Sequence, residues 1–260
     1  MFTTKHKFAM LLHSKLKINI WGEWIMNRKM KKVIFLVTLL GMLPTVSAFA
    51  AIPEVNLQSG DVFLNLDYRS AKTTNNFSGL TLNSNSNVSE LALDVGLGNK
   101  LSVTVESEQY KYDSHGSMGS RRVNISNKNV KATDYSLIYN VSDNISVLAG
   151  YRNFTTDSVI YSNSIQWGAA VENKSPIIGG IIVNYKLDKE NKVGVYANYK
   201  TGADSFKEWT IGADYKIAPK IWLDVNYRST EFDPSTDLLR QHGSVKYKYQ
   251  GTGFGVTYKF

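Results

Sequence analysis

The chain lacks cysteine, and this absence limits both how it is stabilised and what it can bind. Without thiols there is no disulfide, so an exported form must be held together in another way. A metal site of the Cys/His type is also excluded, because only two of the four histidines, His115 and His242, lie beyond residue 50. The sequence therefore predicts neither a metal nor a cofactor.

A long apolar run is missing as well. The stretch Val33–Leu43 stops at Pro44 and is shorter than the roughly 20 residues that a membrane-spanning helix needs. It has instead the layout of a secretory signal, with a basic start and the small-x-small cleavage motif Ala48-Phe49-Ala50. We expect residues 26–50 to be a signal peptide and residues 51–260 the exported domain. An uncleaved membrane helix is the less favoured alternative.

Residues 1–25 precede this signal and have no targeting role, because a basic, unpatterned run is not part of a secretory leader. The tripeptide Trp21-Gly22-Glu23 must be encoded by a purine-rich stretch just upstream of Met26. Such a stretch resembles a bacterial ribosome-binding site. Our hypothesis is that translation starts at Met26 and that residues 1–25 are not translated.

An excess of positive charge is absent from the exported part. The whole chain has 30 Lys and Arg against 22 Asp and Glu, but residues 1–50 hold eight of those bases and one of those acids. Residues 51–260 therefore carry 22 bases against 21 acids. Because nucleic-acid binding needs a basic patch on the folded domain, we expect no nucleic-acid partner.

What the chain does contain is a repeated alternating pattern. In five segments the first, third and fifth residues are apolar, and in four of them the seventh is Tyr and the eighth is Arg or Lys. Strict alternation is typical of strands with one apolar and one polar face. The five segments are Val62–Arg69, Leu101–Glu108, Ile145–Arg152, Val193–Lys200 and Ile221–Arg228.

Five more alternating runs lie between these repeats, so the sequence predicts ten strands. Tight polar turns alternate with connections that are predicted to be loops, mostly long. The further runs are 88–97, 130–141, 177–187, 206–217 and 250–260. The predicted turns are 98–100, 142–144, 188–191 and 218–220. The predicted loops are 70–87, 113–129, 155–176, 201–205 and 229–249.

The polar faces decide where the apolar faces point. They carry Asp, Glu, Lys or Arg on almost every strand, and such groups are very costly in a dry core. A soluble barrel needs the reverse, with apolar residues inside. The predicted fold is therefore all-β: a ten-stranded antiparallel up-and-down transmembrane β-barrel with a polar interior, short periplasmic turns and longer extracellular loops.

Tyrosine marks both ends of the predicted apolar band. It falls late on the outgoing strands and two residues before the end on the returning strands, so that eight of the 15 tyrosines form two rings on the lipid face. Aromatic girdles flank the apolar band of transmembrane barrels. The outer ring is Tyr68, Tyr151, Tyr199 and Tyr227, and the periplasmic ring is Tyr139, Tyr185, Tyr215 and Tyr258.

The last strand has four apolar or aromatic residues in step, Phe254, Val256, Tyr258 and the terminal Phe260. It resembles the C-terminal assembly signal of bacterial outer-membrane β-barrel proteins, the superfamily that includes small porins. The resemblance implies a Gram-negative outer-membrane location, reached through the inner membrane. It also implies delivery by a periplasmic chaperone, recognition by the outer-membrane insertion machinery, and contact with outer-membrane lipid and lipopolysaccharide.

Four bases, Arg69, Arg152, Lys200 and Arg228, are expected inside the barrel near its outer mouth. They either form a basic ring that favours anions or lipopolysaccharide phosphates, or pair internally with acids. Similar numbers of acidic and basic side chains are expected to face inward, which favours internal pairing. The acids expected there are Asp67, Glu90, Glu106, Asp134, Asp214 and Asp224.

Three classes of function remain open. A ten-stranded barrel is narrow, so we expect a non-enzymatic structural or narrow-pore surface protein, porin-like for small solutes. A hydrolase is the second class: Asp113-Ser114-His115 faintly resembles the rim residues of omptin proteases, and His242-Gly243-Ser244 the His-x-Ser of lipid deacylases. The acids that would complete either site are missing. The third class is an adhesin that acts through loops such as residues 72–88 and 155–175.

Peptide mapping of the protein purified from outer membranes tests the predicted processing. We expect an N-terminus at Ala51 and no peptide from residues 1–25, because cleavage follows the small-x-small motif. A peptide from within residues 1–25 would contradict the start at Met26. A mature chain that retains residues 26–50 would contradict the cleavage.

Overall fold

The computed structural model describes residues 57–77, 80–118, 121–162, 165–233 and 245–260, whose regular structure is β-strand. Among these residues no helix is both long enough and apolar enough to cross a membrane. The leader, the Ala48-Phe49-Ala50 motif and the His242-Gly243-Ser244 segment lie outside the described residues, so the predictions made for them stay predictions.

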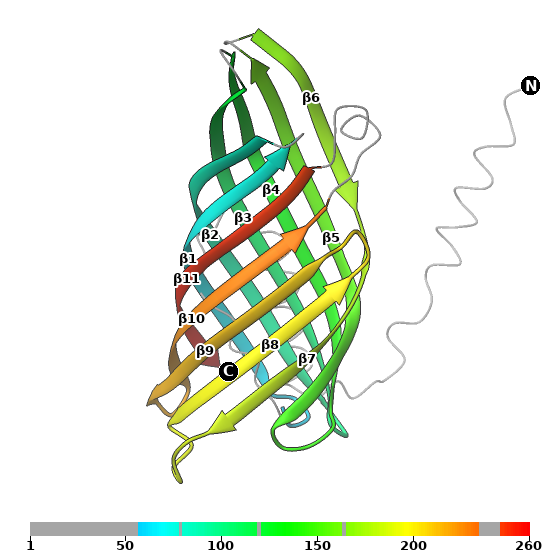
Figure 1. Cartoon of the computed structure of the whole chain (residues 1–260). Coiled ribbons are helices and arrows are strands. Elements are labelled where there is room, and N and C mark those ends of the chain that lie inside the picture. Colours follow the sequence, from blue (N-terminus) through cyan, green and yellow to red (C-terminus); the bar gives the residue numbers. More distant parts are fainter. Residues whose placement is uncertain (1–56, 78–79, 119–120, 163–164, 234–244) are drawn as a thin grey trace, which may run out of the picture. The chain divides into compact units, whose positions relative to one another are not determined.

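The strands pair with their neighbours in an antiparallel ring (Figure 1). Pairing of β1 with β11 and of β4 with β5 closes the sheet. Both β6 and β7 pair with β5, so they form one barrel strand that is interrupted at Ser175 and Pro176; the predicted ten-stranded barrel is confirmed. The elements are β1 (Val62–Phe77), β2 (Leu80–Gly98), β3 (Leu101–Met118), β4 (Arg121–Asn140), β5 (Ile145–Ser162), β6 (Ile165–Lys174), β7 (Ile177–Lys186), β8 (Val193–Gly202), β9 (Lys207–Ala218), β10 (Ile221–Phe232) and β11 (Val245–Lys259).

Short turns and both ends of the strand array gather at one end of the barrel, here called the turn end. The Phe260 amide donates a hydrogen bond to the Val62 carbonyl at 3.0 Å, which joins the last strand to the first. Gly98 begins the β2–β3 turn with a φ of 86°, a conformation that glycine adopts without steric cost. In the β7–β8 turn the Val193 amide donates to Asp188 Oδ1 at 2.8 Å, and this hydrogen bond holds the pKa of Asp188 below its ordinary value.

At the opposite end, here called the hairpin end, the predicted long loops are wrong. Residues 70–87, 113–129 and 155–176 are mostly strand, because β1–β2, β3–β4 and β5–β6 continue as hairpins almost to their tips. Beyond the lipid the outward face of a strand meets water, so the apolar alternation fades while the backbone pairing continues. The predicted 201–205 loop corresponds to the connection of residues 203–206 between β8 and β9.

One wall of the barrel is much taller than the other. The strands β1 to β5 contain 16–20 residues each, whereas β7 to β10 contain 10–12. About 9–11 residues suffice to cross a bilayer. The hairpins of β1 to β6, which we call the extended wall, therefore continue past the apolar band, and Figure 1 shows β5 and β6 rising above the shorter strands.

Burial is inverted relative to a water-soluble barrel. Outward apolar side chains stay exposed, as in Leu137 (48%) and Val225 (53%), whereas inward polar side chains such as Asn65 and Glu90 are fully buried. Seven of the predicted girdle tyrosines are 40–55% exposed on the outer surface, and Tyr227 is half-buried with its ring 5.3 Å from that of Trp209. An outer surface of this composition suits lipid.

Leu137→Arg should destabilise the barrel in a bilayer by about 2–4 kcal/mol, because an arginine at mid-depth on the lipid face is strongly unfavourable. Urea unfolding in lipid vesicles measures the change in the free energy of unfolding. Asn144→Arg in the exposed β4–β5 turn is the control and should change it by less than about 0.5 kcal/mol. Equal effects of the two substitutions would mean that Leu137 does not face lipid.

Candidate functional site

The four predicted lumen bases lie inside the barrel, but they are not at an open mouth. Arg69, Arg152, Lys200 and Arg228 come from β1, β5, β8 and β10 and are only 3–4% exposed. Each follows an outward tyrosine, so strand alternation turns it inward. Together with Glu90, Glu106, Glu108, Asp134 and Glu208 they form a buried cluster that we call the ionic layer.

Arg228 on β10 sits among three acids of β2 and β3, which lie three and four strands away around the ring. Its Nη1 lies 2.6 Å from Glu90 Oε2, 2.9 Å from Glu106 Oε1 and 2.5 Å from Glu108 Oε1. Carboxylate oxygens of these three glutamates lie within 4.8 Å of one another, a spacing that would also suit a metal ion. The guanidinium already supplies the cation there, so the group functions as an ion-pair cluster around Arg228.

Lys200 and Arg152 connect the remaining acids. Lys200 Nζ lies 2.7 Å from Glu106 Oε2, 3.0 Å from Asp134 Oδ2 and 3.3 Å from Glu208 Oε1. Arg152 Nη2 lies 2.7 Å from Glu108 Oε2. The Lys200–Glu106 pair joins β8 to β3, which are four strands apart in the ring of ten, so this ion pair crosses the lumen.

A second set of acids lies nearer the turn end and has few basic partners. Lys186 Nζ lies 3.1 Å from Asp214, while Tyr196 donates to Asp224 at 2.7 Å and Thr104 donates to Asp94 at 2.5 Å. Asn226 Nδ2 donates to Asp67 at 2.5 Å and to Asp224 at 2.8 Å. Acids therefore outnumber bases among the described inward residues, which is the opposite of what an anion-selective ring requires.

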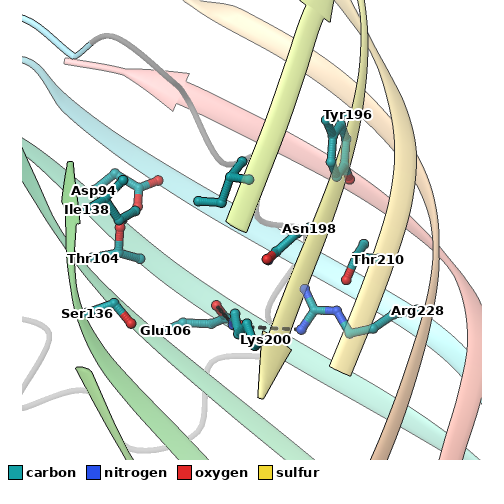
Figure 2. Close-up of a pocket in the computed structure, with 11 residues that line it drawn as sticks. Asp94, Thr104, Glu106, Ser136, Ile138, Tyr196, Asn198, Lys200, Thr210 and Arg228 are labelled. Carbon is teal, nitrogen blue, oxygen red and sulfur yellow. Dashed lines mark hydrogen bonds and ion pairs between the residues drawn. The ribbon is translucent and has the colours of Figure 1, made fainter. Parts of the chain in front are cut away.

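A small polar cavity lies beside the ionic layer. It has a volume of about 30 Å³, enough for one or two waters. Figure 2 shows Asn198 and Thr210 on one side, Asp94 and Thr104 on the other, and the Lys200–Glu106 pair at one end. Asn198 Oδ1 and Thr210 Oγ1 are buried without a hydrogen-bond partner, so water is the fitting occupant.

Toward the hairpin end an aromatic cluster fills the lumen. The ring of Phe154 on β5 lies 4.5 Å from that of Phe232 on β10, four strands away across the barrel. Phe232 stacks in turn on Tyr247 and Tyr249, with ring centroids 5.2 and 5.8 Å away. Ala71, Val88, Val130 and Ala132 complete the cluster. This apolar packing closes the lumen at a second level.

The turn end is closed by the segment that precedes β1. Leu57 is 5% exposed and packs with Phe63 and Trp222, whose rings are 5.8 Å apart. The segment is held against β2, since the Gly96 amide donates to the Asp61 carbonyl at 2.9 Å. A Cβ on Gly96 would lie 2.1 Å from the Gln58 carbonyl oxygen, so only glycine leaves room for the segment there.

The remaining predicted residues are placed as follows. His115 is exposed on β3, and its cross-strand neighbours Asn83 and Asn124 carry amides rather than carboxylates. Glu208 contacts three of the four bases. It was not among the acids predicted from the sequence, although it lies two residues before the inward Thr210 on β9 and therefore shares its face. The assembly-signal residues lie on the outer side of β11, with Phe254, Tyr258 and Phe260 exposed and Val256 partly buried.

No protein-family profile and no curated protein matches the chain by sequence. Solved structures do resemble it. The translocator domain of the autotransporter NalP from Neisseria meningitidis shares 9% identity over 97% of this chain and 98% of that chain, with a TM-score of 0.45. The outer membrane protease OmpT from Escherichia coli shares 11% identity over 80% and 99%, with a TM-score of 0.44.

The attachment invasion locus protein Ail of Yersinia pestis, solved with a heparin analogue, shares 11% identity over 78% of this chain and 100% of that chain, with a TM-score of 0.39. At such identities and TM-scores these likenesses say nothing about activity. The architecture is informative in itself: a closed antiparallel barrel with an apolar outer surface is a design that satisfies every backbone group in hydrocarbon.

Arg228→Met should lower the free energy of unfolding by about 3–5 kcal/mol, because it leaves Glu90, Glu106 and Glu108 without their shared cation. Urea unfolding in lipid vesicles measures the loss. Arg69→Met is the matched comparison and should cost less, since its nearest bridges, to Glu90 at 3.2 Å and Asp67 at 3.4 Å, are longer. Equal losses of unfolding free energy would show that Arg228 with its three acids stabilises the barrel no more than Arg69 does.

Proposed function

We propose that this protein, a bacterial outer-membrane β-barrel, keeps its lumen closed and serves as a rigid, non-enzymatic scaffold at the cell surface. The observation that carries the proposal is the ion pairing across the barrel. Arg228 and Lys200 both reach Glu106 from strands on the other side of the ring. Bridges of this kind obstruct the path that a solute would take.

Closure at further levels supports the same conclusion. The Phe154–Phe232 contact lies toward the hairpin end and the Leu57, Phe63 and Trp222 cluster lies at the turn end. A ten-stranded barrel is only slightly wider than an eight-stranded one, whose interior side chains alone fill. The cavity beside the ionic layer has room for water and not for a nutrient-sized solute.

The extended wall is the part of the scaffold that we propose to display for contact outside the cell. Its hairpins are paired ladders, so they present a stiffer surface than the loops expected from the sequence. Binding residues commonly lie on such protruding elements of a rigid framework. We therefore favour a scaffold that acts as an adhesin or as another interaction protein. Exposed His115, beside two amides, offers no oriented base for hydrolysis.

A gated narrow pore is the second candidate. The lumen is closed by side chains and by the short segment that precedes β1, and these could move without breaking the barrel. If the ion pairs of the ionic layer changed partners and Leu57 moved away, the small cavity would connect to the turn end.

For biogenesis we propose removal of residues 26–50, followed by chaperone delivery and insertion guided by Phe254, Val256, Tyr258 and Phe260.

Planar-bilayer recording tests the closed lumen. Protein purified from outer membranes should give no steady conductance at neutral pH, because the ionic layer and both apolar clusters obstruct the path. Lys200→Ala combined with Arg228→Ala should also remain silent, since the Phe154–Phe232 contact and the Leu57 cluster persist. Steady single-channel currents from the unmodified protein would overturn the proposal, and currents that appear only in the double variant would favour the gated pore.

A further inference from the structure

Three aspartates lie side by side on the inner surface of the barrel, on the turn-end side of the ionic layer. Asp67 on β1 and Asp224 on β10 are both paired with Gly255 of β11, and Asp224 is paired in turn with Asp214 of β9. Each of the three side chains is at most 2% exposed. We call Asp67, Asp214 and Asp224 the acidic row.

The acidic row has little positive charge beside it. Lys186 Nζ lies 3.1 Å from Asp214 Oδ1 and neutralises that aspartate. Arg69 Nη2 lies 3.4 Å from Asp67 Oδ1, but it is nearer to Glu90 Oε2, at 3.2 Å, so its charge is shared between two acids. Asp67 is therefore only partly neutralised by the chain itself.

Asp224 is the least compensated member of the acidic row. It accepts hydrogen bonds from Tyr196 and from Asn226, neither of which carries a positive charge. It forms no ion pair within the part of the chain that the structure describes. Because a buried carboxylate without a cation is unfavourable, the acidic row carries negative charge that a ligand would neutralise.

The amide of Asn226 joins two members of the row and leaves its oxygen unused. Its Nδ2 donates to Asp67 Oδ2 at 2.5 Å and to Asp224 Oδ1 at 2.8 Å. The opposite orientation of the amide would turn an oxygen toward both carboxylates, so the orientation is fixed. Asn226 Oδ1 is then buried with no hydrogen-bond donor, and the same is true of Asp67 Oδ1. Buried polar atoms normally have a partner, so these two oxygens indicate a missing ligand.

Gly253 on β11 leaves the space into which these oxygens turn. A Cβ added to Gly253 would lie 2.7 Å from Asn226 Oδ1, and 2.7 and 2.8 Å from the two carboxylate oxygens of Asp67. The amide oxygen and the carboxylate thus converge over one glycine, with no side chain of β11 between them. Oxygens with negative charge repel one another at such separations, and a cation between them removes the repulsion.

We propose that a calcium ion binds at the acidic row, held by the carboxylates of Asp67 and Asp224 and by Asn226 Oδ1. Carboxylate and amide oxygens are preferred calcium ligands, and a flexible shell of about six to eight oxygens suits ligands that come from different strands. Magnesium requires a tighter octahedral arrangement and gives up its water reluctantly. The sequence predicted no metal because cysteine is absent and histidine is scarce, but an oxygen site needs neither.

The calcium ion would hold together the part of the barrel where the ring closes. Strand β11 lies between β1 and β10, so ligands from Asp67 and Asp224 are joined across the last strand. These ligands are far apart in the unfolded chain, and calcium binding therefore favours the folded barrel. The proposal does not depend on whether the lumen conducts or whether the extended wall binds a partner.

Equilibrium dialysis with radioactive calcium tests the proposal on the full protein, purified from outer membranes in detergent and freed of metal with EGTA. A long dialysis is needed because the Leu57 cluster closes the turn end. We expect one calcium ion per barrel, retained in excess sodium chloride, with magnesium at least about tenfold weaker as a competitor. Absence of bound calcium at millimolar free calcium, or equal competition by magnesium, would overturn the proposal.

Two variants locate the calcium site in different ways. Asp224→Asn removes a charged ligand, and Gly253→Ala fills the space over the glycine while leaving every ligand in place. Each should raise the Kd for calcium by at least about tenfold. The control Asp143→Asn removes the same charge from the exposed β4–β5 turn and should leave the Kd within about twofold. If both site variants bind calcium as tightly as the unmodified protein, the ion lies elsewhere and the proposal is wrong.

The stability of Asp224→Asn separates calcium binding from a purely structural role. In EGTA the variant should unfold at the same temperature as the unmodified protein or higher, because it lacks an uncompensated buried charge. In millimolar calcium the unmodified protein should gain stability and the variant should not, so that their order reverses. Thermal unfolding in detergent measures both. A difference between the two proteins that is the same in EGTA and in calcium would contradict the proposal, even if Gly253→Ala does not fold.

Discussion

The structure depends on the pairing of backbone groups inside hydrocarbon. An amide or carbonyl without a partner there costs several kcal/mol, so a transmembrane sheet is stable only when no edge is left open. β1 pairs with β11, and β4 with β5, which closes the ring. Closure also fixes the two faces, because every second side chain must then enter the lumen. The exposed apolar belt and the buried polar interior are two results of this one constraint.

The ionic layer follows from placing charged faces in a narrow ring. Its four bases and five acids come from eight strands, and each base has at least two acidic neighbours. A single buried ion pair often fails to offset its own desolvation, but shared partners in a network reduce that cost. The same contacts bind opposite walls of the barrel together. Rigidity and obstruction of the lumen therefore have a common origin in the Arg228 and Lys200 clusters.

With the interior occupied, the chemistry available for recognition moves to the outer surfaces. The extended wall carries paired hairpins past the apolar band, where they can be reached from outside the barrel. A scaffold whose apolar belt lies in lipid while its taller wall projects past the belt would keep a defined orientation at the cell surface.

The sequence by itself determined the strand number, the direction of the apolar faces and the inward position of Arg69, Arg152, Lys200 and Arg228, because alternation with period two is a local property of the chain. It failed for residues 70–87, 113–129 and 155–176, where the regular apolar alternation is lost and only hydrogen bonding to a neighbouring strand reveals the hairpins. Two further features depended on the placement of distant strands. Arg228 meets Glu106 across 122 positions, and Phe154 meets Phe232 across the lumen. Only the closed tertiary structure brings such residues together, since their proximity comes from ring closure and strand stagger rather than from any pattern within one segment.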